Sequence, residues 1–317
     1  MSTYLITAIS FPNRRKCHLM DVSIIIVNYN TKKLLSDCLE SIMENTTGLC
    51  YEVIVSDNGS QDGSVEMLKN NFKEVILIEN NENLGFGAAN NRALSVANGK
   101  YIFYLNSDTV LMNNAVKMFY DYWENNESIK NKGCLGAQLL NEDMKPTHSW
   151  ANYPTPLGTL KTLLHMCLLP DTNFRKNQCF EDIPRDGLVI DGYVTGAALF
   201  LKNDENAFFD EQFFMYAEET DLEYNHFYKK GKKSVIIPGP QIIHLEGGSD
   251  SSSIMSEYDF GKKSVIFLWI SNLKYLRKNF PKSTFLIAMI KAILVFVWNR
   301  KKYKNRTYKF KNELMSI

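Results

Sequence analysis

Three short polar segments of this chain carry side chains that could hold a metal ion or act in catalysis. The first, Asn106-Ser-Asp108, directly follows the unbroken apolar run Tyr101–Leu105, so its carboxylate is predicted to lie at the carboxyl end of a buried strand. Open α/β sheets bind their ligands at this end, which makes Asp108 a candidate ligand of a metal or a substrate. Taken alone, the same residue types more often form only a turn or a helix cap.

Two later segments add titratable groups. Glu218 and Glu219 stand before Thr220–Glu223, which has the pattern of a capping box, so we expect a helix from there to about Lys230 with the acidic pair just ahead of it. Two adjacent carboxylates at a helix entrance usually only face solvent or stabilise the helix dipole. His244 follows a short apolar strand and is either a metal ligand or a structural histidine.

The elements that must position these groups alternate between strand and helix. The patterns predict strands at 22–27, 53–57, 75–78 and 101–105, and helices at 34–42, 65–72 and from about 86 to 98. This alternation predicts a doubly wound, mostly parallel α/β sheet. Asn28, Asp57, Asn90 and Asp108 then provide polar groups near the strand ends, although each alone is more often a turn or cap residue.

Nucleotide binding through a phosphate loop is not indicated. No predicted strand is followed by GxGxxG or GxxxxGK[ST], and Gly85-x-Gly87 alone is too short a pattern to count. A nucleotide would therefore have to be bound by polar side chains at the strand ends.

A series of segments resembles the nucleotide-sugar half of family-two inverting glycosyltransferases, which have the GT-A fold. Order and spacing agree over roughly residues 21 to 280, and several motifs in sequence are more specific than any one of them. The segments are Val22–Asn30, Ser56–Ser60, Asn83–Asn91, Asn106–Asp108, Thr195–Ala198, Phe214–Leu222 and His244–Ser249.

The resemblance implies a role for each matching residue. Asp108 and His244 are expected to bind Mg²⁺ or Mn²⁺, which stabilises charge on the leaving diphosphate. Glu219 is expected to be the general base for the acceptor hydroxyl, Glu218 to orient the acceptor, and Asp221 to brace the helix start and to be the next candidate base. The expected nucleotide-sugar ligands are Asn28, Asn30, Asp57, Gly85, Phe86, Gly87, Asn90, Asn106, Ser107, Gly196 and Ala197.

Two positions differ from the family pattern. Asn106 stands where a first carboxylate is frequent, and the acidic pair is Glu218-Glu219 where Glu-Asp is common. Because an amide can still position a ligand and a glutamate can still accept a proton, the predicted chemistry stays possible. The same differences leave open a catalytically silent sugar-nucleotide or glycan-binding partner in a biosynthetic complex. A nucleotidyltransferase is the other alternative, but it would be expected to carry a basic glycine-rich loop where Asn28–Thr31 stands.

The resemblance and the composition together divide the chain into three parts. We expect an N-terminal extension at 1–20, a glycosyltransferase domain at 21–280, and an amphipathic, basic C-terminal tail at 281–317. The net charge of +1 gives no case for nucleic-acid binding, and from Lys282 to Lys311 there is no Asp or Glu. The apolar run Thr284–Trp298 is shorter than the roughly 20 residues of a membrane span, so an interfacial helix is expected, with packing on the core or in a homodimer as the alternative.

Together these features predict an inverting, metal-dependent glycosyltransferase. dTDP-rhamnose is the first donor to consider, because Asn83–Asn91 is most similar to the corresponding segment of bacterial rhamnosyltransferases, and a UDP-hexose is the second. A glycan or lipid-linked glycan acceptor and surface polysaccharide biosynthesis follow from a membrane-associated enzyme. The six cysteines form no CxxC pair, which favours reduced thiols and a cytoplasmic location on the inner face of the membrane.

Overall fold

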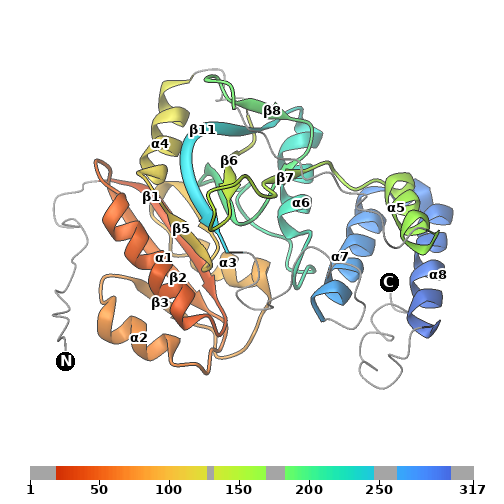
Figure 1. Ribbon diagram of the computed structural model, residues 1–317, viewed down its shortest axis with the longest axis horizontal. Helices are drawn as coiled ribbons and strands as arrows, with labels where there is room; N and C mark the ends of the chain where they lie inside the picture. Colours follow the sequence, from red (N-terminus) through yellow and green to blue (C-terminus); the bar gives the residue numbers. More distant parts are fainter. Residues whose placement is uncertain (1–18, 127–131, 169–182, 246–262, 301–317) are drawn as a thin grey trace.

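The computed structural model describes residues 19–126, 132–168, 183–245 and 263–300 (Figure 1). Its central feature is a nine-stranded sheet in the order β3-β2-β1-β4-β10-β6-β11-β5, with β8 also paired to β11. The strands of this sheet are β1 (Met20–Asn28), β2 (Tyr51–Asp57), β3 (Ile76–Glu79), β4 (Gly99–Leu105), β5 (Thr109–Leu111), β6 (Leu135–Leu140), β8 (Leu188–Ile190), β10 (Ala198–Lys202) and β11 (Ser234–His244).

The sheet is mixed, with most strands running the same way. β3, β2, β1 and β4 are mutually parallel, and β6 and β11 run in the same direction as these four. β10, β5 and β8 run against them. A separate two-stranded sheet joins β7 (Trp150–Ala151) to β9 (Tyr193–Val194). The carboxyl ends of β1, β2 and β4 therefore meet at one edge of the main sheet.

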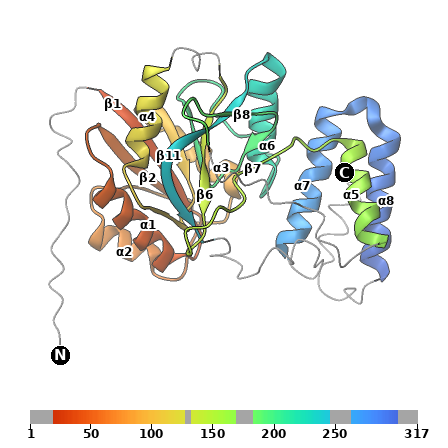
Figure 2. The same cartoon turned by 45° about the horizontal axis from the view of Figure 1, so that its top comes forward.

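Helices cover both faces of the sheet, which explains the apolar strands. In β1, Ile24 and Ile26 pack into one core with α1 (Lys32–Asn45) and α4 (Ala115–Asn125), while Ile25 packs into a second core with α3 (Phe86–Leu94). All three isoleucines have 0% exposure, so the β-branched run is buried from both sides. α2 (Ser64–Asn71) lies on the α1 side (Figures 1 and 2).

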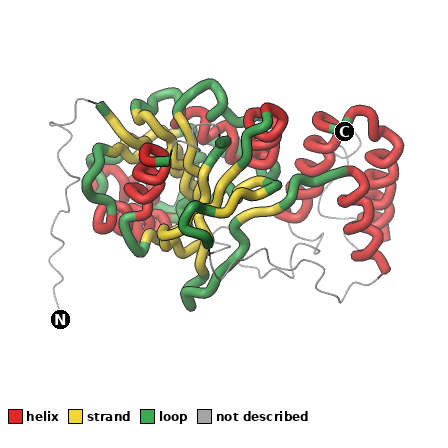
Figure 3. Tube along the Cα trace, turned by 90° about the horizontal axis from the view of Figure 1, so that it is seen from above, coloured by secondary structure: helices red, strands yellow, loops and turns green. Residues whose placement is uncertain are grey.

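A helical extension lies at the opposite end of the molecule from β3 (Figure 1), and Figure 3 shows it as a group of helices beside the strands of the main domain. It consists of α5 (Pro156–Leu168), α7 (Lys263–Asn279) and α8 (Thr284–Arg300), with a short 3-10 turn at Pro281–Ser283. These helices form a third core that also includes Phe213 and Ala217 of the main domain. Within the described residues, no helix is both long and apolar enough to span a membrane.

The predicted α/β architecture is confirmed, and three local expectations are wrong. α3 ends at Leu94 and not near Asn98. Cys38 and Cys134 are free thiols as expected, but Cys50 is disulfide-bonded. α6 (Glu218–Leu222) begins two residues before Thr220, so the acidic pair lies inside its first turn. A π-helical turn, Glu223–Phe227, and a 3-10 turn, Tyr228–Lys230, continue it. Most of the expected N-terminal extension (residues 1–18) and part of the expected tail (residues 301–317) lie outside the described ranges.

Candidate active site

The carboxyl ends of β1 and β2 are joined by side chains that the sequence assigned to nucleotide binding. Asn28 and Asp57 are register partners, and Asn28 Nδ2 donates to Asp57 Oδ2 at 2.7 Å. Asp57 Oδ1 accepts the N–H groups of Gly59 at 3.0 Å and Ser60 at 2.8 Å. The Asp57 carboxylate therefore already builds the turn after β2, and a ligand would have to share it.

A second set of bonds ties this edge to the end of β4. Thr31 Oγ1 donates to Asn28 Oδ1 at 2.7 Å and lies 3.0 Å from Ser107 Oγ. Asn30, in a left-handed conformation with φ 54°, accepts the Gln61 N–H through Oδ1 at 2.7 Å. Asn28, Asn30, Asp57 and Ser107 are thus brought together at one edge, as the strand pattern predicts.

The Asn83–Asn91 segment lies between this edge of the sheet and the segment Phe214–Leu222, which carries the acidic pair. Asn58 Nδ2 donates to the Gly85 carbonyl at 3.1 Å, and Phe86 N donates to the Phe214 carbonyl at 2.8 Å. Gly85 has φ +89°, and a Cβ there would lie 2.2 Å from the Phe214 oxygen. Only glycine fits this approach. Asn90 is 1% exposed and donates to the Phe86 carbonyl inside α3, which is a structural use of its amide group.

The acidic pair stands at the start of α6 after a strained turn. Tyr216 and Ala217 have φ of 68° and 66°, and such left-handed non-glycine residues cost of order 1–3 kcal/mol each. Glu218 is buried, and its Oε2 has no hydrogen-bond partner among the described residues. Burial, and then the negative charge of Glu219, raise the pKa of Glu218 well above its ordinary value.

Glu219 is the more accessible of the two carboxylates. It is partly exposed, and burial raises its pKa, an effect partly offset by the backbone N–H groups of Glu219, Thr220 and, least, Gly196. A Cβ on Gly196 would lie 3.7 Å from Glu219 Cβ and 3.6 Å from Phe86 Cε1. Gly196 therefore lies against both the Phe86 ring and the Glu219 side chain.

The same segment reaches the end of β4. Ala198 pairs with Leu105, and Asn106 N donates to the Ala197 carbonyl at 3.0 Å. Gly196 therefore contacts Glu219, while its neighbour Ala197 bonds to the segment that carries Asp108. This links the predicted base to the predicted metal ligand through one short turn.

Asp108 and His244 lie close enough to bind one ion. Their Oδ1 and Nε2 atoms are 3.3 Å apart, and adjacent octahedral ligands of Mg²⁺ are about 3 Å apart. Each side chain is 15% exposed, and His244 Nδ1 has no hydrogen-bond partner in the described part of the chain. Among the described residues, no group of three or more His, Cys, Asp and Glu is placed to hold a metal. The pair fits a cation that diphosphate oxygens and waters share.

Asp221 is engaged structurally. Its Oδ2 accepts Lys278 Nζ at 2.6 Å, and its Oδ1 accepts Asn225 Nδ2 at 2.8 Å and Asn279 Nδ2 at 3.0 Å. It is 2% exposed. The carboxylate joins α6 to α7, in agreement with a bracing role, and these contacts leave little room for proton transfer to an acceptor.

Two further residues, not predicted from the sequence, shape this site. No local sequence pattern pointed to Lys278, because its partner Asp221 lies 57 positions away. Glu223 stands four residues after Glu219 on a helical path, and this spacing alone places it on the same face.

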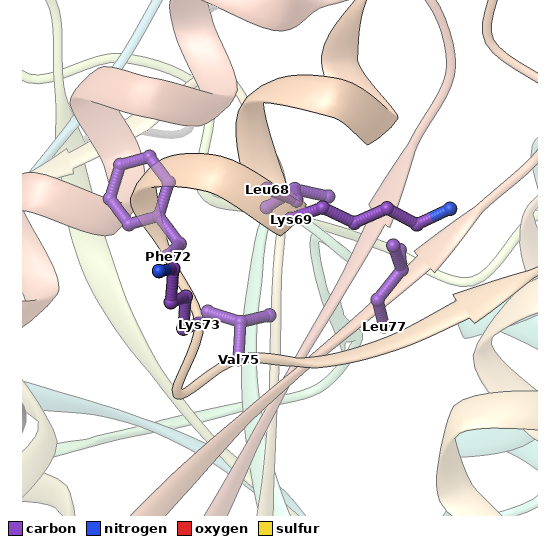
Figure 4. Close-up of a pocket in the computed structure, with 6 residues that line it drawn as sticks. All are labelled: Leu68, Lys69, Phe72, Lys73, Val75 and Leu77. Carbon is purple, nitrogen blue, oxygen red and sulfur yellow. The ribbon is translucent and has the colours of Figure 1, made fainter.

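Two pockets lie away from these residues. One, of about 240 Å³, is formed by Leu68, Lys69, Phe72, Lys73, Val75 and Leu77 around α2 and β3 (Figure 4). Another, of about 570 Å³, lies beside β6 and β11 and includes Gln138 and Gln241. Neither contains a residue of the strand-end site, so neither bears on its chemistry.

Part of the chain matches a known protein family. Residues 23–174 match the model of "Glycosyl transferase family 2". Poly(ribitol-phosphate) beta-glucosyltransferase of Bacillus spizizenii is 35% identical over 41% of this chain and 22% of its own length. Cholesterol galactosyltransferase of Borreliella burgdorferi is 24% identical over 93% of this chain and 82% of its own length. The chain thus spans only about a fifth of the first relative but most of the second.

Two solved structures share the fold. S. aureus TarS superposes with a TM-score of 0.52 over 92% of this chain and 45% of TarS, at 13% identity. GalNAc-T7, crystallised with UDP, GalNAc and Mn²⁺, superposes with a TM-score of 0.54 over 82% of this chain and 48% of its own, at 15% identity. At such identities these likenesses support the fold alone. Residues 23–174 therefore match the family-two glycosyltransferases, and most of the chain shares the GT-A fold of these two structures.

Proposed function

We propose that the chain is an inverting, metal-dependent glycosyltransferase that transfers a sugar from a nucleoside diphosphate to a glycan or lipid-linked glycan in surface polysaccharide synthesis. The observation that carries the proposal is the turn Gly196-Ala197. It contacts the Glu219 carboxylate on one side and the segment with Asp108 on the other. A base for the acceptor and a ligand for the leaving group are thereby joined to one small-residue turn.

In the proposed reaction the acceptor oxygen attacks the anomeric carbon and the bond to the diphosphate oxygen breaks, with inversion at that carbon. Glu219 takes the acceptor proton, since it is the partly exposed carboxylate and its raised pKa makes it a better proton acceptor than an ordinary glutamate. Glu218, whose pKa burial raises well above the ordinary value, stays protonated and can orient the acceptor. Asp108 and His244 would hold Mg²⁺ or Mn²⁺, which when bound stabilises negative charge on the diphosphate.

Phe86, Gly196 and Ala197 form the proposed surface for the donor sugar, while Asn28, Asn30 and Asp57 lie where a nucleoside would bind. Gly85 and Gly87 allow this close packing: a Cβ on Gly87 would lie 3.1 Å from Phe209 Cβ. Asn106 and Ser107 lead to the metal ligand. Two relatives are named as a glucosyltransferase and a galactosyltransferase, which favours a UDP-hexose as the donor. The similarity of Asn83–Asn91 to rhamnosyltransferases keeps dTDP-rhamnose as the alternative donor. The Mn²⁺ and UDP of GalNAc-T7 agree with this choice of ligands.

A donor panel tests the function. We expect UDP-glucose, UDP-galactose or dTDP-rhamnose to raise the melting temperature in the presence of Mn²⁺, because a ligand of the folded state stabilises it. The same donor should release nucleoside diphosphate when a mixture of lipid-linked glycans is added. Stabilisation without release would indicate a sugar-nucleotide binding partner that does not catalyse transfer. No stabilisation by any donor would contradict the proposal.

We also propose a peripheral location on the inner, anionic face of the membrane, through α8. Ile287, Ile290 and Leu294 of this helix are buried in the third core, whereas Phe285 and Met289 are 75% and 36% exposed. In the sequence, Lys301 and Lys302 follow the last residue of α8, and anionic lipids attract such basic segments.

Flotation with anionic vesicles tests this location. Phe285→Ser should weaken vesicle binding, whereas Phe208→Ser, at a phenylalanine that is 47% exposed on the main domain, should not. A homodimer that Phe285→Ser dissociates, with no vesicle binding by either form, would favour a subunit interface.

A further inference from the structure

Glu223 is a fully buried carboxyl group to which the proposed reaction assigns no role. It is 0% exposed and lies at the start of the π-helical turn after α6. Its Oε1 and Oε2 lie 3.0 and 3.1 Å from the Val194 amide nitrogen, which donates to them. Oε2 also accepts from Ser234 Oγ at 2.6 Å and from Cys134 Sγ at 3.1 Å. One side chain thus connects β9, β11 and the residue before β6.

The position of Glu223 relative to Glu219 is regular. The two carboxyl groups are four residues apart on one helical path, so they lie on the same side of it. Val194, which donates to Glu223, ends β9, and Gly196 lies two residues later in the turn that follows. A Cβ on Gly196 would lie 3.7 Å from Glu219 Cβ and 3.8 Å from Glu219 Cδ. The Val194–Gly196 segment therefore meets the helix at both glutamate side chains.

We propose that Glu223 is a positioning residue that holds the Tyr193–Gly196 stretch so that Gly196 meets the Glu219 carboxylate. This inference rests on the proposed role of Glu219 as the base. Removal of the Glu223 carboxyl group would free the Val194 N–H and let the turn move away from Glu219. Ser149 gives the stretch one further anchor, because its carbonyl accepts Thr195 N at 3.1 Å.

Glu223 also makes this arrangement sensitive to alkaline pH. Burial raises its pKa to about 8, and the negative charge of Glu219 adds to the shift. The other titratable groups that face it are the Cys134 thiol and the Tyr153 hydroxyl, and burial raises the pKa of both. Glu223 is therefore protonated at neutral pH. Above pH 8 it ionises, and its negative charge then faces Cys134 and Tyr153, neither of which carries a positive charge. The contact of the Gly196-Ala197 turn with Glu219 should weaken as a result.

The pH profile of turnover tests this role. Glu223→Gln keeps the size, can still accept the Val194 N–H and cannot ionise, so it should retain most of the neutral-pH rate and lose the alkaline limb near pH 8. Glu223→Ala should lower kcat roughly tenfold or more, because a buried donor loses its partner. The matched control is Glu52, a buried glutamate that accepts Ser23 Oγ and Asn98 N at the opposite end of the sheet. Glu52→Gln should leave the alkaline limb unchanged.

Hydrogen exchange of peptides covering residues 188–202 provides a test that does not need turnover. We expect Glu223→Ala to speed exchange there at neutral pH, Glu223→Gln to restore protection, and Glu52→Ala to have no effect in this region. Wild-type protein should lose the same protection above pH 8. Unchanged exchange in Glu223→Ala, or an alkaline limb that persists in Glu223→Gln, would overturn the proposal. If wild type transfers no sugar but the exchange pattern appears, the proposed function fails and the positioning contact stands.

Discussion

Lys278 Nζ lies 2.6 Å from Asp221 Oδ2 and 2.6 Å from Asp210 Oδ2, so one ammonium group of α7 joins both ends of the acidic segment 210–221. Two further α7 side chains bind the backbone between them: Ser271 Oγ donates to the Met215 carbonyl at 2.7 Å, and Lys274 Nζ to that of Gln212 at 2.9 Å. The strained turn before Glu218 is therefore held in place by the helical extension.

Lys278→Met should destabilise the protein and lower turnover. Asp221 is 2% exposed and would lose its charged partner, while its two amide partners remain. We expect the free energy of unfolding to fall by about 2 kcal/mol. This is less than the 3–5 kcal/mol lost when a fully buried ion pair is broken, because Lys278 is partly exposed. Urea unfolding measures the loss. Lys33→Met, at an exposed pair with Asp37 on α1, is the control and should leave the free energy of unfolding nearly unchanged. Equal losses in both variants would contradict the tethering role.

Ile290→Ala tests whether α8 belongs to the folded enzyme. The side chain is 0% exposed in the third core, so the free energy of unfolding should fall by about 2–5 kcal/mol. Phe285→Ser on the opposite face of α8 should change it by less than about 1 kcal/mol. The two melting curves measure this difference. If Ile290→Ala melts like wild type, α8 is not packed as described.

The strands and the positions of the polar residues at their ends could be predicted from the sequence more completely than the structure around Glu218 and Glu219. The β-branched run in β1 has a distinctive pattern because both of its faces are buried, Asp57 ends β2, and Asp108 comes three residues after the end of β4. The early start of α6 could not be foreseen, since neither Tyr216 nor Ala217 is a residue type that favours a left-handed turn. Long-range contacts, such as that of Lys278 with Asp221, leave no local pattern.

Gly85→Ala should disrupt the donor side of the site. The added Cβ would lie 2.2 Å from the Phe214 carbonyl oxygen, so the loop and the acidic segment must separate. Gly231 provides a control for an added Cβ at a positive φ, because it has φ +74° and nothing within 4 Å of that Cβ. Gly231→Ala should cost only about 1 kcal/mol of backbone strain. Donor-dependent thermal shifts distinguish the variants, and equal donor binding by both would refute the tight approach.

Asp108→Asn should weaken the metal-dependent turnover while the fold remains intact. The substitution keeps the shape of a partly exposed side chain but removes the charged ligand beside His244. We expect the rate with saturating donor to fall at least about tenfold and the apparent Mn²⁺ affinity to weaken. Titration of the rate with Mn²⁺ measures both. A mutant with the wild-type Mn²⁺ response would exclude Asp108 as a ligand.

The most direct test of the proposed chemistry compares Glu219→Gln with Glu218→Gln. If Glu219 is the base, its glutamine variant cannot take the acceptor proton, so kcat should fall about a hundredfold or more while donor affinity barely changes. The acid limb of its pH profile, which reports ionisation of a base with a pKa above the ordinary value, should disappear as well. Glu218→Gln imitates the protonated form of a buried acid and should change the Michaelis constant for the acceptor more than kcat. A dead Glu218→Gln beside a mild Glu219→Gln, or normal turnover in both, would contradict this assignment.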